Sequence, residues 1–97
     1  MSIILVGGHD RMHERYKSIG SKHGHRMKIF TQMPAKFEKL IGEPDCILLF
    51  TNTVSHKMVK AAVKEAKRKN IPVIRCHNSS ASSLESSIKQ LEGSVVL

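Results

Sequence analysis

"PDCILLFTNTVSHKMVKAAVKEAKRKNIPVI", residues 44–74, has the pattern of a strand, a helix and a second strand in succession. Its first segment, CILLF (Cys46–Phe50), is apolar throughout, which is typical of a parallel strand buried on both faces. A helix with one apolar stripe follows from about Ser55 to Lys69, and Asn70 can take the left-handed conformation that ends a helix. IPVIR (Ile71–Arg75) then supplies another strand. The stretch therefore predicts a right-handed crossover between two parallel strands.

The same alternation continues toward the amino terminus. SIILV (Ser2–Val6) is continuously apolar, whereas RMKIF (Arg26–Phe30) alternates and suits an edge strand. Four strand segments with helical patterns between them predict a three-layer α/β/α fold, whose four-stranded parallel sheet has the strand order 2-1-3-4. This is a half-Rossmann or flavodoxin-like arrangement. We expect residues 1–97 to form a single domain.

Helix boundaries follow from capping residues. Asp10 is a plausible N-cap for the first helix, Gly24 can stop the chain before the second strand, and Pro34 suits the first turn of a short helix that Gly42 ends. The residues expected to face the core from these two helices are Met12, Tyr16, Ile19, Phe37, Leu40 and Ile41.

Composition narrows the class of protein. The chain has 97 residues and a formal net charge of +8, from 16 Lys and Arg against 8 Asp and Glu. Such a charge attracts polyanions. No apolar run approaches the roughly 20 residues that span a bilayer, and MSIILVGG lacks the basic leader of a signal peptide. We expect a cytoplasmic protein without a membrane segment. Cys46 and Cys76 should lie at opposite ends of adjacent strands, too far apart for a disulfide.

The carboxyl ends of the strands are the expected binding site, because ligands of open α/β sheets lie where crossovers leave to opposite faces. Glycines there allow close approach of a ligand, helix starts offer N–H groups, and two arginines supply charge. The sequence lacks the G-x-G-x-x-G and P-loop motifs. We therefore expect a small anionic or nucleotide-like ligand, held by Gly7, Gly8, Arg11, Thr51, Asn52, Ser55, His56, Arg75, Ser79 and Ser80.

RCHNSSASS (Arg75–Ser83) follows the last strand. Ser82 stands three residues before Glu85, the spacing of a capping box, and the apolar stripe Leu84, Ile88 and Leu91 comes next. The pattern predicts a helix that Ser82 caps and Gly93 ends. In this interpretation Arg75 and Ser80 face the ligand.

Three alternatives remain open at this stage. His56, with His9 and His77 at the same edge, could bind haem iron or a divalent metal. A nucleic-acid-associated protein would use the lysines of the third helix, Lys57, Lys60, Lys64 and Lys67. Catalysis is undecided, since it would require an acid, base or nucleophile among Asp10, His56, Cys76 and His77. An edge strand and the tail Val95, Val96 and Leu97 also predict a homodimer.

The chain resembles the small bacterial proteins grouped as domain of unknown function 2325. The resemblance rests on VGGHDRMHERY (Val6–Tyr16), on residues 44–74 and on RCHNSSASSLESSI (Arg75–Ile88), and it covers nearly the whole chain. It implies no established reaction. The positions that match are Gly7, Gly8, Arg11, Tyr16, Ser55, His56, Arg75, Ser80 and Ser83, and all except Tyr16 lie near the predicted edge.

Overall fold

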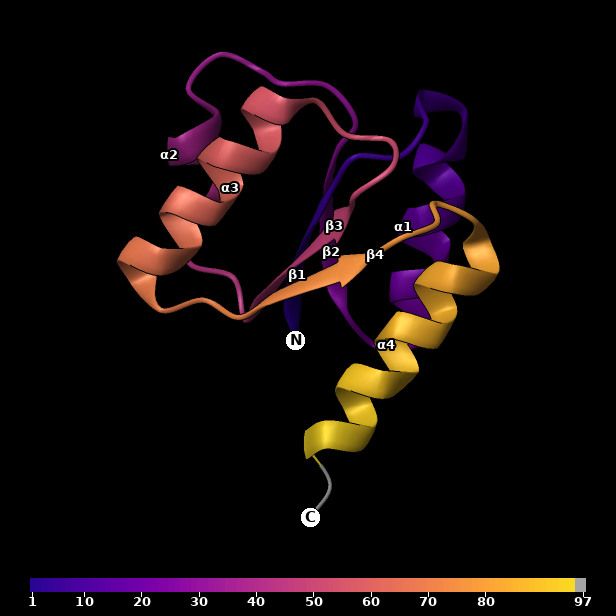
Figure 1. The fold of residues 1–97 in the computed structure, drawn as a ribbon. Coiled ribbons are helices and arrows are strands. Elements are labelled where there is room, and N and C mark those ends of the chain that lie inside the picture. Colours follow the sequence, from indigo (N-terminus) through magenta and orange to yellow (C-terminus); the bar gives the residue numbers. More distant parts are fainter. Residues whose placement is uncertain (96–97) are drawn as a thin grey trace.

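The computed structural model describes residues 1–95 and confirms the predicted fold class (Figure 1). All four strands are parallel and lie in the order β2-β1-β3-β4. In chain order the elements are β1 (Ser2–Val6), the 3₁₀ turn η1 (Asp10–Met12), α1 (His13–Lys22), β2 (Arg26–Phe30), α2 (Phe37–Ile41), β3 (Cys46–Phe50), α3 (His56–Lys69), β4 (Val73–Cys76) and α4 (Ala81–Val95).

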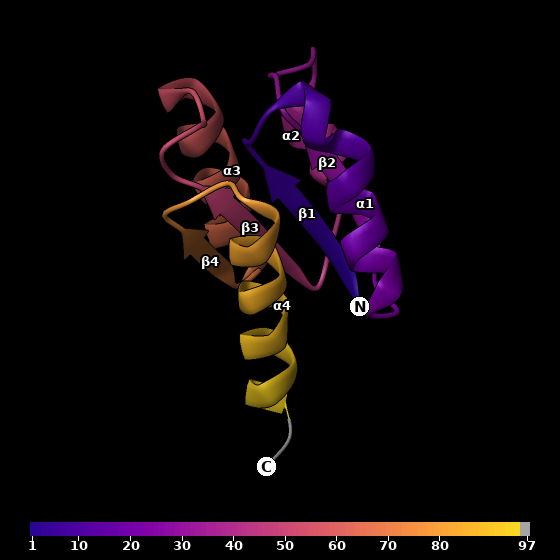
Figure 2. The same ribbon diagram turned by 90° about the vertical axis from the view of Figure 1, so that its right-hand side faces the viewer.

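The sheet separates two apolar cores. α1 and α4 cover one face, and α2 and α3 cover the other (Figure 2). Because successive side chains of a strand point to opposite faces, Leu48 packs under α1 and α4 whereas Leu49 packs under α3. Every residue of β3 is buried, and β2 at the edge is half-exposed. The apolar composition of the central strands is thus the direct cause of the three layers.

β4 begins two residues later than the sequence predicts. Ile71 closes the end of α3 instead, where its N–H donates to the carbonyl of Ala66 at 2.8 Å. Pro72 has no N–H to give to a sheet, although its carbonyl accepts from Ile47 of β3 at 3.0 Å. Regular pairing therefore starts at Val73.

The predicted ends of α3 are confirmed, whereas the predicted start of α1 is not. Ser55 Oγ accepts from the N–H of Met58 at 3.2 Å and caps α3, and Asn70 ends that helix with φ of 57°. The predicted cap of α1 is wrong. Asp10 lies in η1, and its carboxylate accepts from the side chains of Thr31 and Gln32, because the loop after β2 supplies donors that sequence spacing could not reveal.

Two further helix predictions are corrected. Leu40 was expected in the core but is 43% exposed, because α2 has one turn and turns only Phe37 and Ile41 inward. Gly93 was expected to end α4, but the helix continues to Val95. A glycine inside a helix costs only about 1 kcal/mol relative to alanine, which packing of the helix can offset. The tail residues Val96 and Leu97 lie outside the described residues.

Glu65 of α3 is buried, at 4% exposed, and two neighbouring cations compensate its charge. It accepts from Arg68 Nε at 3.1 Å and Nη2 at 3.0 Å, and it lies 3.4 Å from Lys69 Nζ. Lys69 Nζ also donates to the Gly42 carbonyl at 2.8 Å. The hydrogen bonds from Arg68 hold the pKa of Glu65 below its usual range. This cluster joins α3 to the end of α2.

No helix within residues 1–95 is both long and apolar enough to cross a bilayer.

Candidate functional site

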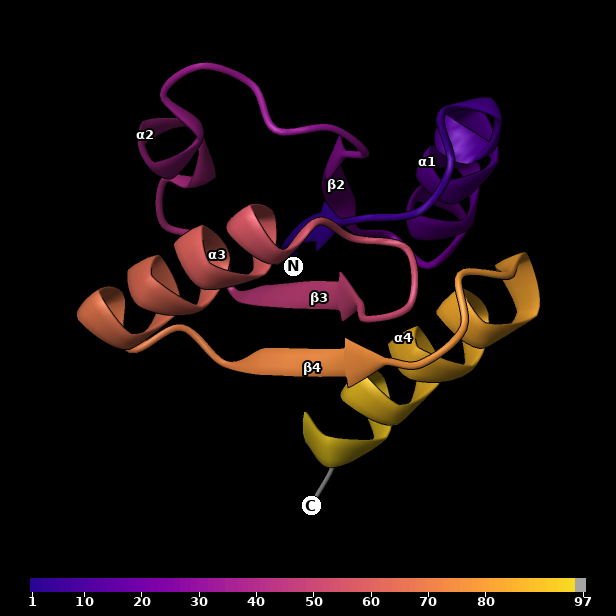
Figure 3. The ribbon, with the colours of Figure 1, turned by 45° about the horizontal axis from the view of Figure 1, so that its top comes forward.

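Three loops meet at the carboxyl edge of the sheet and are tied to one another (Figure 3). The Gly8 N–H, after β1, donates to the Thr53 carbonyl at 3.2 Å and to Thr53 Oγ1 at 3.1 Å. The Thr51 N–H, after β3, donates to the Cys76 carbonyl at 2.9 Å. The Tyr16 hydroxyl of α1 donates to the Ser79 carbonyl, after β4, at 2.7 Å. These bonds make one continuous surface from segments far apart in the sequence.

The glycine pair after β1 serves internal packing. Both residues have positive φ, 103° for Gly7 and 88° for Gly8. A Cβ on Gly7 would lie 3.1 Å from that of Val54, and one on Gly8 would lie 2.8 Å from the Tyr16 hydroxyl oxygen. Their N–H groups are also engaged, since Gly7 donates to the Phe30 carbonyl at 2.9 Å and Gly8 donates to Thr53. These glycines were expected to let a ligand approach the backbone closely, which stays a prediction; the structure shows that they make room for Val54 and Tyr16.

Tyr16 has a second role that the sequence did not reveal. Its side chain is fully buried, and its ring packs on Phe50 with a centroid distance of 5.4 Å. A buried tyrosine hydroxyl needs a hydrogen-bond partner, and here the partner is the Ser79 carbonyl. From the sequence, one could predict that the hydroxyl of a buried Tyr16 has a hydrogen-bond partner. The sequence could not identify that partner, because residues 16 and 79 are far apart in the chain.

Helix-start serines at this edge act as caps. Ser80 Oγ accepts from the Ser83 N–H at 3.2 Å, and the Ser80 N–H donates to Asn78 Oδ1 at 2.9 Å. α4 begins at Ala81, so Ser80 is the cap and the prediction of Ser82 is wrong. Ser82 is exposed within the first turn. The capping-box spacing failed because a run of serines offers several equivalent starts, and Asn78 selects among them.

A Ser80→Ala variant should lose about 1 kcal/mol of unfolding free energy, because the N–H of Ser83 loses its acceptor at the helix start. Ser82→Ala should change stability by less than about 0.5 kcal/mol, since the substituted side chain is on the surface. Urea denaturation of both variants measures the difference. Equal losses would contradict the assignment of Ser80 as the cap.

Five of the exposed side chains on this edge form what we call the rim: His9, Arg11, Asn52, His56 and His77. None of these side chains makes a hydrogen bond or ion pair to another of the described residues. The three loops contain one acidic residue, Asp10, and Thr31 and Gln32 already engage it. The rim therefore offers a permanent charge at Arg11, one amide group at Asn52 and three imidazoles, with no free carboxylate.

Arg75 does not join Arg11 at the rim. Ile74 and Cys76 point into the core under α4, so the alternation of β4 turns Arg75 to the opposite face of the sheet. There it lines a hollow together with Lys67 of α3. Arg11 belongs to the turn that leads into α1, on the other face. Both arginines were predicted at the same edge because each follows the end of a strand. That argument did not include the direction of their side chains.

Both cysteines are buried, including Cys76, which was a candidate nucleophile. Cys76 is buried, its Sγ lies 3.0 Å from Ser87 Oγ, and burial raises the pKa of its thiol. Burial raises the pKa of Cys46 to about 11. Both thiols are free, and Cys76 pairs with Phe50 at the far end of the strand that Cys46 begins. Burial of both thiols thus disfavours the thiolate form that a nucleophile requires.

Metal binding needs several ligands in one place. Within residues 1–95 no three or more His, Cys, Asp or Glu side chains are grouped so as to hold a metal ion. His9, His56 and His77 share the edge without forming such a group. Axial coordination of haem iron by one histidine is not subject to this requirement and stays a prediction.

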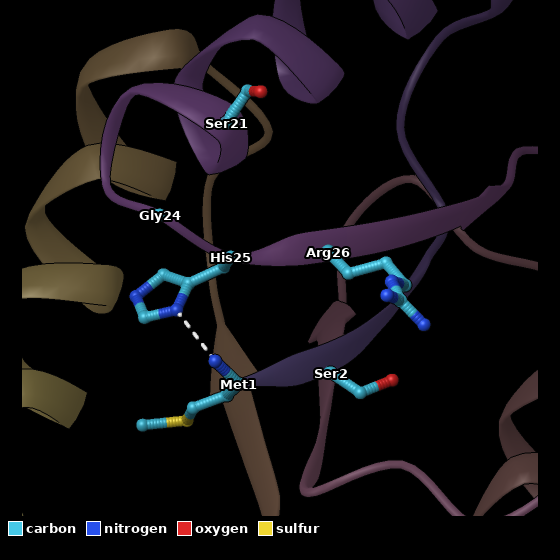
Figure 4. Close-up of a pocket in the computed structure, with 6 residues that line it drawn as sticks. All are labelled: Met1, Ser2, Ser21, Gly24, His25 and Arg26. Atoms are coloured by element: carbon cyan, nitrogen blue, oxygen red, sulfur yellow. Dashed lines mark hydrogen bonds between the residues drawn. The ribbon is translucent and has the colours of Figure 1, made fainter.

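One hollow of about 460 Å³ lies at the opposite end of the sheet, where the strands begin (Figure 4). Met1, Ser2, Ser21, Gly24, His25 and Arg26 line it. His25 Nδ1 is 3.1 Å from the Met1 amine, and the Arg26 side chain extends away from His25 along the strands. None of these residues belongs to the binding site that the sequence predicts.

The fold and the rim define a class: a small parallel α/β domain of flavodoxin-like strand order, with a polar edge at the carboxyl ends of its strands. The model of a family described as uncharacterized protein conserved in bacteria (DUF2325) matches residues 2–91, and the chain belongs to that family. No curated protein and no solved structure matches the chain.

Proposed function

We propose that the protein is a small ligand-binding or sensory module that binds an anion, such as the phosphate of a nucleotide-like ligand, at the rim. One observation carries the proposal. Hydrogen bonds tie the three loops together while Arg11, Asn52 and His56 keep their side chains free. A surface that is already ordered loses little conformational entropy when a ligand binds.

Each rim residue has a distinct role in this proposal. Arg11 supplies charge-assisted hydrogen bonds, and Asn52 fixes orientation through its amide. His56 is the first residue of α3, whose positive dipole end favours an anion. The other expected ligand residues, Gly7, Gly8, Thr51, Ser55, Ser79 and Ser80, hold the loops in place, and Arg75 lies outside the site.

A thermal-shift screen with phosphate, sulfate and nucleotides tests the proposal. An anion at about 100 times its dissociation constant should stabilise the wild type by roughly 2.7 kcal/mol. Arg11→Ala should weaken binding about tenfold to a hundredfold, because a contact to a charged group contributes roughly 1.5–3 kcal/mol. Arg75→Ala is the matched control on the other face and should keep the full shift. If no anion stabilises the wild type, or if Arg11→Ala binds as well as wild type, the proposal fails.

A nucleic-acid-associated function is the second candidate. Lys57, Lys60, Lys64 and Lys67 are exposed along α3, and no carboxylate of residues 1–95 pairs with them. Three of the four aromatic side chains, Tyr16, Phe37 and Phe50, are buried, so contacts would be to phosphate. Binding that falls steeply with salt and is unaffected by Arg11→Ala would favour this candidate over the first.

Other expectations stay proposals of narrower scope. Haem or a divalent metal would use His56 before His9 or His77, and a His56→Ala variant would then change the absorbance spectrum of the bound form. We also propose a cytoplasmic location. A homodimer through an edge strand is a further proposal, which light scattering tests.

A further inference from the structure

β4 has an unpaired edge. It pairs with β3 on one side, and no strand among residues 1–95 pairs with it on the other (Figure 3). The Pro72 carbonyl accepts from Ile47 of β3 at 3.0 Å, and the Cys76 carbonyl accepts from Thr51, just after β3, at 2.9 Å. Because backbone groups alternate in direction along a strand, Val73 and Arg75 direct their N–H and C=O groups away from the sheet. These groups can pair with one more strand.

A hollow of about 360 Å³ lies beside this edge, on the α3 face. α3 packs on β1 and β3, and on the same face Val73 and Arg75 of β4 stay half-exposed and exposed. The floor of the hollow is apolar and includes the half-exposed side chains of Val63, Ile71 and Val73. The complete lining is Val63, Ala66, Lys67, Asn70, Ile71, Val73 and Arg75. An apolar side chain from outside would bury surface that water now covers.

The charge at this edge has one sign. Lys67 and Arg75 are exposed and line the hollow, and no acidic residue lines it. Neither cation makes an ion pair with a carboxylate of residues 1–95. A charged side chain in the middle of an edge strand prevents indiscriminate pairing with neutral strands. Here the charge instead selects for a strand that carries carboxylates.

We propose that the β4 edge, with Lys67 and Arg75, is a docking site for an extended acidic segment of another protein, which adds to the sheet as a strand. Its backbone pairs with Val73 and Arg75, one apolar side chain enters the hollow, and its carboxylates meet the two cations. A second copy of β4 would bring like charges together across the two-fold axis. A nucleic acid would leave the apolar floor unfilled.

The test is fluorescence anisotropy with a labelled peptide in which every second residue is in turn glutamate, valine and glutamate, with threonine between them, so that the carboxylates and the apolar side chain share one face of the added strand. We expect saturable binding to the wild type and no binding of the same peptide with lysine in place of glutamate. Lys67→Glu and Arg75→Glu should each weaken binding about tenfold or more. Lys28→Glu is the matched control, because it makes the same charge change midway along β2, at the other edge of the sheet. It should bind as wild type does.

Backbone pairing needs its own measurement, since charge alone could attract the peptide. Amide hydrogen exchange at Val73 and Arg75 should slow when the peptide binds, and a peptide N-methylated on alternate residues should lose binding. Unchanged binding of the N-methylated peptide, absence of binding to the wild type, or a DNA duplex that binds this edge more tightly than the peptide would each overturn the proposal. So would a dimer in light scattering that Arg75→Glu strengthens. These outcomes are independent of Arg11 and therefore of the rim.

Discussion

A Gly8→Ala variant should lose about 3 kcal/mol of unfolding free energy, the sum of roughly 1–2 for a side chain at positive φ and 1–3 for overpacking. The added Cβ would lie 2.8 Å from Cε2 and from the hydroxyl oxygen of Tyr16. The ring cannot withdraw, because it is fully buried against Phe50 and its hydroxyl is bonded to the Ser79 carbonyl. Urea denaturation followed by circular dichroism measures the loss.

Gly24→Ala provides the control for backbone strain. Gly24 also has positive φ, 76°, but its Cβ would meet no atom within 4 Å. This variant should lose only the roughly 1–2 kcal/mol that the left-handed conformation costs a side chain. If Gly8→Ala costs no more than Gly24→Ala, the contact between Gly8 and Tyr16 is not a tight one in solution.

Tyr16→Ala should destabilise the protein by about 3–5 kcal/mol, the usual range for removing a buried aromatic side chain. Tyr16→Phe isolates the hydroxyl and should cost about 1–3 kcal/mol, because the Ser79 carbonyl is left without its donor. Denaturant unfolding of both variants gives these values. In Tyr16→Phe, hydrogen exchange should also speed up in the loop after β4, which the hydroxyl fixes.

The double variant Gly8→Ala, Tyr16→Ala links the two predictions. With the ring removed, the Cβ on residue 8 has room, so Gly8→Ala should then cost only its backbone part. The two losses should therefore sum to more than the loss of the double variant by about 1–3 kcal/mol. Strict additivity would mean that the two residues do not interact.

The sheet could be predicted because its central strands are apolar on both faces. SIILV and CILLF admit one interpretation, and their bounds as β1 and β3 are confirmed. α3 was predicted closely for a similar reason, since Ser55 and Asn70 each have one local role. Short elements were harder. α2 has one turn, so its helical spacing could not distinguish exposed Leu40 from buried Ile41.

The candidate site was only partly predictable. The carboxyl edge was chosen from topology, and the structure places Arg11 and His56 at that edge, whereas ligand binding there stays a prediction. Long-range partners were not predictable, because nothing local indicates that Thr53 engages the N–H of Gly8 or that Tyr16 reaches Ser79. The strand end alone did not assign Arg75 to a face of the sheet, and the structure turns its side chain to the α3 side. Its alternation with Cys76 becomes decidable only when the core side of β4 is known.

Synthesis of the chain leaves β1 half-paired for an interval. β1 pairs with β2 on one side, where Ile3 faces Met27, and with β3 on the other, where Ile3 faces Cys46. β2 emerges from the ribosome well before β3. During that interval β1, which is apolar from Ile3 to Val6, has one edge without a partner strand. Such an edge can join any other exposed strand. The finished molecule presents β2 and β4 instead, each with a cation midway, so the danger of aggregation belongs to the incomplete chain.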